Sequence, residues 1–144
     1  MTPVGPLTDP GRREHRLDLV LWSIVALSIV STVVWSFVEP PGAGLGHAID
    51  KVQHSLAYFV TVLATLLAAV WRPGRGPGRF PDARWLIAAG ALAGGALIEI
   101  LQSVSTTNRQ GDVGDWLAEV VGVGLAVLAL RVLEQRSSAR SAAV

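Results

Sequence analysis

Hydrophobic positions along the chain fall into four long runs, and short polar segments separate them. The first run, Leu19 to Val38, holds 20 residues without a charged side chain. At about 1.5 Å per helical residue, it can cross a hydrocarbon core of about 30 Å. A cleaved signal peptide is the alternative, but its apolar region usually has about 7–15 residues, and here Pro40 and Pro41 follow instead of a cleavage site. The pattern predicts membrane-spanning helices at about residues 17–38, 49–71, 85–104 and 112–133.

The polar segments predict a single membrane domain with two short extensions. Residues 1–16 are rich in proline, glycine and arginine and are expected to form a disordered basic leader. The membrane domain covers residues 17–133, and residues 134–144 form a polar tail that is expected to be disordered. The fold class is therefore all-α, a bundle of four transmembrane helices. Small residues spaced four apart, Gly90 with Gly94 and Ala118 with Gly122, can let helix backbones approach closely in lipid.

Composition supports a membrane protein and excludes several other classes. The chain of 144 residues is 51% hydrophobic and only 16% charged, and its mean hydropathy is +0.47. Soluble domains carry about 25% charged residues. The net charge of +1, without a basic stripe, gives no sign of nucleic-acid binding. The absence of cysteine excludes disulfides and thiolate metal sites, and no cofactor is expected.

The distribution of basic residues predicts the orientation in the membrane. Ten of the twelve lie in the leader, in the loop of residues 72–84, or from Arg131 at the end of the fourth run onward, and only Lys51 and Arg109 lie elsewhere. Because positive loops stay in the cytoplasm, both termini and the second loop are expected there. The first and third loops should then face outward. The bias toward arginine, alanine and glycine is typical of a high-GC bacterial genome, so the expected location is the bacterial plasma (inner) membrane, with several passes.

This orientation brings polar residues of three helices to the outer surface. Asp50, His54 and Tyr58 repeat every four residues, so they form one stripe at the start of the second span. Glu99 and Gln102 share a face at the end of the third span. The residues expected to bind a ligand are Asp50, Lys51, His54, Tyr58, Glu99, Gln102, Arg109, Asp112, Asp115 and Glu119.

Two interpretations of these polar residues compete. Asp50, Lys51 and Asp112 could be ordinary helix-end charges, since acidic groups suit helix N-termini. His54, Glu99 and Glu119 lie deeper, where charges are costly and usually face a bundle interior or a wet cavity. A functional site is therefore the favoured interpretation, and Arg109, in the turn above it, is expected to pair with Glu99 or Asp115.

The order of these motifs resembles the VanZ-like integral membrane proteins. The resemblance rests on Asp50-Lys51-x-x-His54-x-x-x-Tyr58, on Glu99-x-x-Gln102, and on Arg109 followed by Asp115 and Gly122, and it covers about residues 47–125. Two positions depart from the pattern: Ile98 stands where many members have aspartate, and Glu119 where many have asparagine. The resemblance implies a small bacterial multi-pass protein with a role in the cell envelope, of the glycopeptide or teicoplanin resistance type.

Three functions remain open at this stage. The first is binding of a membrane lipid or a lipid-linked envelope precursor, in which Lys51 and Arg109 would bind phosphate. The second is a membrane enzyme that acts on a lipid headgroup by acid–base or metal-assisted chemistry, with His54, Asp50 and Glu99 as catalytic candidates. The third is proton-coupled transport, which would require a homo-oligomer.

No metal is expected from the sequence. A zinc site is disfavoured because His47 and His54 are the only histidines at the outer surface. Ca²⁺ or Mg²⁺ would suit the oxygen ligands better.

Overall fold

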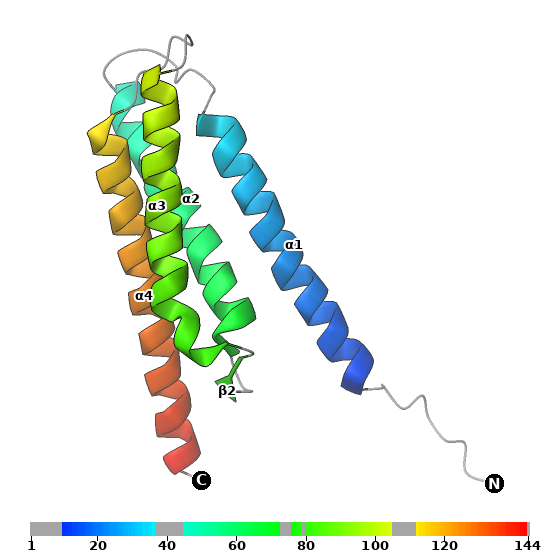
Figure 1. Ribbon diagram of the computed structural model, residues 1–144. Helices are drawn as coiled ribbons and strands as arrows, with labels where there is room; N and C mark the ends of the chain where they lie inside the picture. Colours follow the sequence, from blue (N-terminus) through cyan, green and yellow to red (C-terminus); the bar gives the residue numbers. More distant parts are fainter. Residues whose placement is uncertain (1–9, 37–44, 73–75, 79, 105–111, 144) are drawn as a thin grey trace, which may run out of the picture.

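The computed structural model describes residues 10–36, 45–72, 76–78, 80–104 and 112–143, and its main elements are four long helices (Figure 1). These are α1 (Pro10–Ser36), α2 (Leu45–Ala69), α3 (Arg84–Val104) and α4 (Val113–Ala142). Between α2 and α3 lie the two-residue strands β1 (Trp71–Arg72) and β2 (Gly76–Pro77), which pair antiparallel, and the short 3-10 helix η1 (Pro81–Ala83). The predicted all-α fold class is confirmed.

All four helices are long and apolar enough to cross a membrane. The spanning segments are His15–Val34, Ala48–Ala69, Pro81–Val104 and Val113–Ala142. The chain is therefore a multi-pass membrane protein. In Figure 1 the Pro10 end of α1 and the Ala142 end of α4 lie at the same end of the molecule as β2. The start of α2, the end of α3 and the start of α4 meet at the opposite end.

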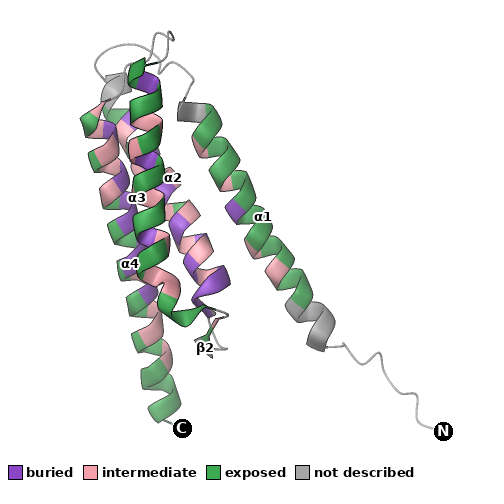
Figure 2. Cartoon of the chain, viewed as in Figure 1, coloured by how far each residue is buried: buried purple, intermediate pink, exposed green. Residues whose placement is uncertain are grey.

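The core of the bundle lies between α2 and α4. Figure 2 shows buried positions along both helices. Leu66 on α2 and Ala126 and Leu130 on α4 are completely buried. The two backbones approach closely at Gly122, because a Cβ at this position would overlap the carbonyl oxygen of Ser55. The expectation of close packing at Ala118-x-x-x-Gly122 therefore holds at Gly122. It is wrong for Gly90 and Gly94, where a Cβ would meet nothing within 4 Å.

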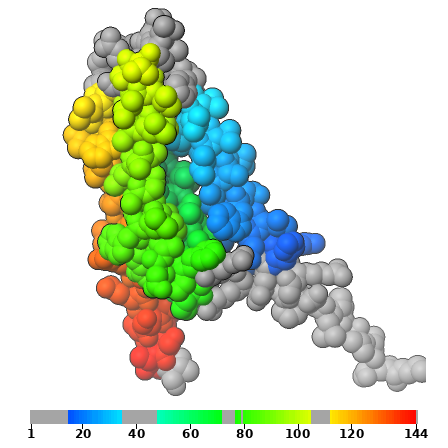
Figure 3. All heavy atoms as spheres, viewed as in Figure 1, coloured from blue at the N-terminus to red at the C-terminus, as the bar shows by residue number. Residues whose placement is uncertain are grey.

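Helix α1 is attached to the bundle mainly through α2. Val25 is the only buried residue among those of α1 whose side chains the structure describes. Figure 3 shows α2 recessed between α1, in blue, and α3, in yellow-green. The outer face of α1 is apolar, with Leu27 and Val30 strongly exposed. Such a face is suited to contact with lipid.

Both expected disordered extensions are partly helical. Helix α1 begins at Pro10, inside the predicted leader, because proline suits the first helical position, where its missing N–H costs nothing. Residues 1–9 lie outside the described part of the chain.

The predicted disordered tail is also wrong as far as Ala142, because α4 continues to that residue. Its alanine, arginine, glutamine and glutamate residues favour a helix. The hydroxyls of Ser138 and Ser141 donate to the carbonyls of Glu134 and Ser137. At about 1.5 Å per residue, the 30 residues of α4 exceed the hydrocarbon thickness, so its last turns extend beyond the membrane core.

Candidate functional site

Nine of the ten residues expected at the site fall within the described chain, at one end of the bundle. We call them the polar cluster. Helix α2 supplies four, α3 two, and the start of α4 three: Asp50, Lys51, His54 and Tyr58; Glu99 and Gln102; Asp112, Asp115 and Glu119. The tenth, Arg109, and its predicted pairing with Glu99 or Asp115 lie outside the described residues.

Asp112 joins the end of α3 to the start of α4. Its carboxylate caps α4 by accepting a hydrogen bond of 2.7 Å from the backbone N–H of Gly114. Its own backbone N–H donates to Glu99 Oε2 at 2.6 Å. Glu99 thus holds the two helices together at this end, which gives this partly buried carboxylate a structural partner.

Lys51 is held between two acids of α4. Its Nζ lies 2.7 Å from Asp112 Oδ2 and 3.0 Å from Asp115 Oδ1. Gly114 makes room for this contact, since a Cβ there would collide with the ammonium group. The lysine that the sequence suggested for gripping phosphate is therefore already paired with two carboxylates, and its side chain is 30% exposed.

His54 lies among three carboxylates in the interior of the cluster. Its Nε2 is 3.8 Å from Asp50 Oδ1 and 4.0 Å from Asp115 Oδ2. On the other side of the ring, Nδ1 is 3.5 Å from Glu119 Oε1. Both ring nitrogens thus face acids from different directions, an arrangement suited to proton exchange or to metal binding.

Glu119 is the most deeply placed acid, with no exposed surface. A Cβ at Gly95 of α3 would collide with its carboxylate and would come within 2.9 Å of the Tyr58 hydroxyl. Gly95 therefore makes the space in which Glu119 and Tyr58 meet. Gln102, also buried, completes the cluster on α3.

The cluster carries an excess of acid. Among its described residues, five carboxyl groups face a single ammonium group, that of Lys51. Because unpaired charge is costly in a buried, membrane-embedded setting, such an excess favours a bound cation or shared protons.

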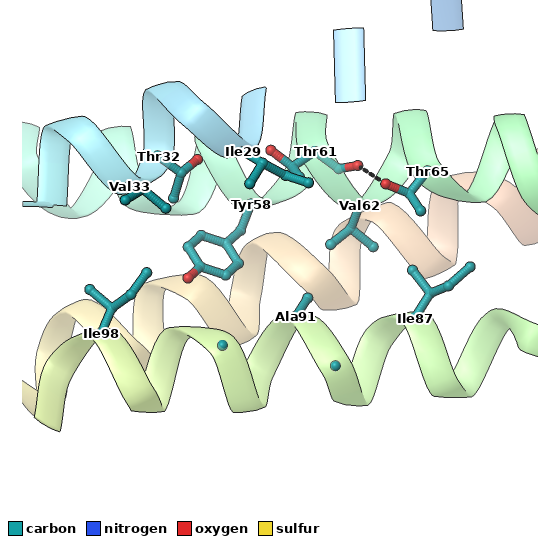
Figure 4. Close-up of a pocket in the computed structure, with 12 residues that line it drawn as sticks. Ile29, Thr32, Val33, Tyr58, Thr61, Val62, Thr65, Ile87, Ala91 and Ile98 are labelled. Atoms are coloured by element: carbon teal, nitrogen blue, oxygen red, sulfur yellow. Dashed lines mark hydrogen bonds between the residues drawn. The ribbon is translucent and has the colours of Figure 1, made fainter. Parts of the chain in front are cut away.

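A cavity of about 400 Å³ adjoins the cluster at Tyr58 (Figure 4). Its lining comes from α1, α2 and α3: Ile29, Thr32, Val33, Tyr58, Thr61, Val62, Thr65, Ile87, Gly90, Ala91, Gly94 and Ile98. The threonine hydroxyls at the wall are largely occupied by their own helices, since Thr32 and Thr65 donate to the carbonyls of Ser28 and Thr61. The cavity therefore presents a mainly apolar surface.

Tyr58 belongs to both features. Figure 4 shows its ring among the residues of the cavity, with the hydroxyl directed toward α3. That hydroxyl lies beside the Glu119 carboxylate, since both are close to the position that a Cβ would take at Gly95. The polar cluster is compact and mostly buried, and Tyr58 is the one residue that it shares with the lining of the cavity.

Sequence reasoning missed Gly95 and the whole cavity lining except Tyr58. The signal for Gly95 was its place one turn before Glu99, on the same face of α3. The cavity had no comparable signal, because its walls are ordinary apolar and threonine residues of three helices.

The fold and the cluster together define a four-helix multi-pass membrane protein with an acidic interior site near one membrane surface. Comparison with protein-family models, with curated proteins and with solved structures finds no match for this chain. The resemblance to the VanZ-like proteins accordingly rests on the motif residues alone.

Proposed function

We propose that the protein binds a membrane lipid or a lipid-linked component of the cell envelope. The hydrocarbon chain would lie in the cavity between α1, α2 and α3, and the headgroup would lie at the polar cluster. The observation that carries this proposal is the position of Tyr58, whose ring lines the cavity and whose hydroxyl lies beside Glu119. An apolar compartment and a polar one are thus adjacent, which matches the hydrocarbon chain and the polar headgroup of an amphipathic ligand.

The cavity supports the hydrocarbon part of the proposal. Its volume of about 400 Å³ lies within the usual range of small-molecule sites, about 300–1,000 Å³. One wall is α1, which packs mainly on α2 and is otherwise exposed. Because α1 stands at the lipid-facing side, a chain could enter sideways from the bilayer.

The rim of the cluster supports the headgroup part. The Asp112 side chain is 38% exposed, and its carboxylate can accept further hydrogen bonds from hydroxyl or amine groups. Lys51 is engaged with Asp112 and Asp115, so it does not offer a free positive charge to a phosphate. Headgroup recognition would therefore rest on hydrogen bonding at the rim more than on direct phosphate capture by this lysine.

Filling the cavity should remove the lipid. In Gly94→Phe the ring enters the cavity without meeting other atoms at the Cβ position. We expect native mass spectrometry in mild detergent to show lipid retained by the wild type and reduced about ten-fold or more in Gly94→Phe, equivalent to about 1.4 kcal/mol. Gly124→Phe is the matched control, because Gly124 is equally open but lies on α4 away from the cavity. Equal lipid retention by both variants would refute the proposed binding site.

The same proposal includes an outward-facing site in a bacterial plasma membrane and a role in the envelope of the glycopeptide-resistance type. Its support is the asymmetry of basic residues together with the VanZ-like motif residues. We expect alkaline phosphatase fused after Val144 to be inactive, because both termini would be cytoplasmic. An active fusion would place the polar cluster on the cytoplasmic side.

A second candidate is an enzyme that acts on the same headgroup. The observation that favours it is His54, whose two ring nitrogens face Asp50 and Asp115 on one side and Glu119 on the other. Such a histidine can transfer protons. An enzyme would convert the co-purified lipid over time in a His54-dependent manner, whereas a binding protein would release it unchanged.

A further inference from the structure

We propose that Asp50, His54 and Asp115 form a binding site for a divalent transition-metal ion of the Zn²⁺ or Mn²⁺ class, with Glu119 orienting His54. Each of the first three residues offers one ligand atom, and these atoms lie within 4.8 Å of one another. The inference does not depend on lipid binding, because the site is made entirely of side chains from α2 and α4.

The distances around His54 fit a shared ion. Nε2 lies 3.8 Å from Asp50 Oδ1 and 4.0 Å from Asp115 Oδ2, too far for direct hydrogen bonds. Two ligands bound at about 2.1 Å to a tetrahedral ion lie about 3.4 Å apart. A contraction of about half an ångström, within the reach of side-chain rotation, would therefore bring both carboxylates to this spacing from Nε2.

Glu119 supplies an independent observation that points to a ligand. It is completely buried, and among the described residues neither of its carboxylate oxygens accepts a hydrogen bond. Its Oε1 faces Nδ1 of His54 at 3.5 Å. Metal-binding histidines commonly donate the second ring N–H to a carboxylate, which fixes the tautomer and leaves the other nitrogen for the metal.

Lys51 and the metal can share Asp115. Lys51 contacts Oδ1 of this residue, while Oδ2 faces His54. The two cations would thus use different oxygens of one carboxylate. Together they would offset part of the acid excess of the cluster.

The donor set selects the class of ion. Two carboxylates and one imidazole mix oxygen with nitrogen, and imidazole suits zinc and other transition metals, whereas Ca²⁺ and Mg²⁺ prefer oxygen alone. Zinc was disfavoured from the sequence because histidines are few. The structure makes zinc a candidate ion, because Asp50 and His54 on α2 come together with Asp115 on α4.

The test is metal titration of the full chain in detergent, purified with a histidine-free affinity tag and stripped with EDTA. We expect isothermal titration with ZnCl₂ or MnCl₂ to give one site per chain. Asp50→Asn and His54→Gln should abolish it. Glu119→Gln should weaken it about 10- to 100-fold, since this residue acts through His54. Asp82→Asn, which alters an exposed acid on η1, should bind like the wild type.

Two results would overturn the inference. One is a wild-type protein that takes up neither ion, a result that needs no variant to fold. The other is Asp50→Asn and His54→Gln proteins that bind as the wild type does. For Mn²⁺, electron–nuclear double resonance should in addition show a nitrogen coupling that is absent in His54→Gln. A coupling that persists would exclude His54 as the ligand.

Discussion

Gly122→Val should prevent correct packing of the bundle. A Cβ at Gly122 would overlap the backbone carbonyl oxygen of Ser55, and it would come within 3.1 Å of the backbone nitrogen of Phe59. Backbone atoms of a packed helix cannot move aside as a flexible side chain can. Overpacking commonly costs about 1–3 kcal/mol, and we expect this substitution to reach or exceed the upper value. Size-exclusion chromatography after detergent extraction should show the loss of monodisperse protein.

Gly124→Val provides the matched control for this change. The substitution is the same, two residues further along α4, but a Cβ at Gly124 meets nothing within 4 Å. The control should elute and melt like the wild type, apart from the small cost of a β-branched residue in a helix. If both variants lose the folded peak equally, helix propensity and not the α2–α4 contact is responsible.

Lys51→Met should produce the second large effect. Removal of the ammonium group leaves Asp112 and Asp115 without their shared cation, beside the buried acids of the cluster. Breaking a fully buried pair costs about 3–5 kcal/mol. Because the Lys51 side chain is 30% exposed, we expect about 2 kcal/mol, measured as a lower melting temperature by tryptophan fluorescence in detergent.

Arg84→Met is the control for Lys51→Met. Arg84 forms a two-bond ion pair with Glu134 at the opposite end of the bundle, at 3.1 Å for each bond. The exposure of the two side chains, 27% and 24%, is similar to that of Lys51. Without Arg84, Glu134 loses its partner, but its carboxylate can turn toward water. The drop in melting temperature should therefore be smaller than for Lys51→Met. A larger drop for Arg84→Met would contradict this prediction. It would indicate that water or shared protons stabilise the acids that Lys51→Met leaves without their cation.

The four spans and most of the polar cluster could be predicted from the sequence. The length of an apolar run can be compared directly with the thickness of the hydrocarbon core that a helix must cross. The helical spacing of Asp50, His54 and Tyr58, and of Glu99 and Gln102, placed each set on one face of its helix. The partners inside the cluster required the structure, because the pairing of Lys51 with Asp112 and Asp115 depends on how α2 and α4 rotate about their axes.

Three other features lay beyond sequence reasoning. The tail was expected to be disordered because it is polar, yet its helix formers and serine hydroxyls continue α4. Gly90 and Gly94 fit a packing motif but line a cavity. The cavity itself depends on the angle at which α1 packs against α2, and no local pattern in the sequence determines that angle.

The most direct test of lipid binding is an experimental structure of the protein in nanodiscs formed from its native membrane. We expect density for a hydrocarbon chain among Ile29, Val62 and Ala91, continuing past Tyr58 to a headgroup at the rim of the polar cluster. A structure in which α1 has closed onto α3, with side chains filling the cavity and no lipid reaching Tyr58, would contradict it.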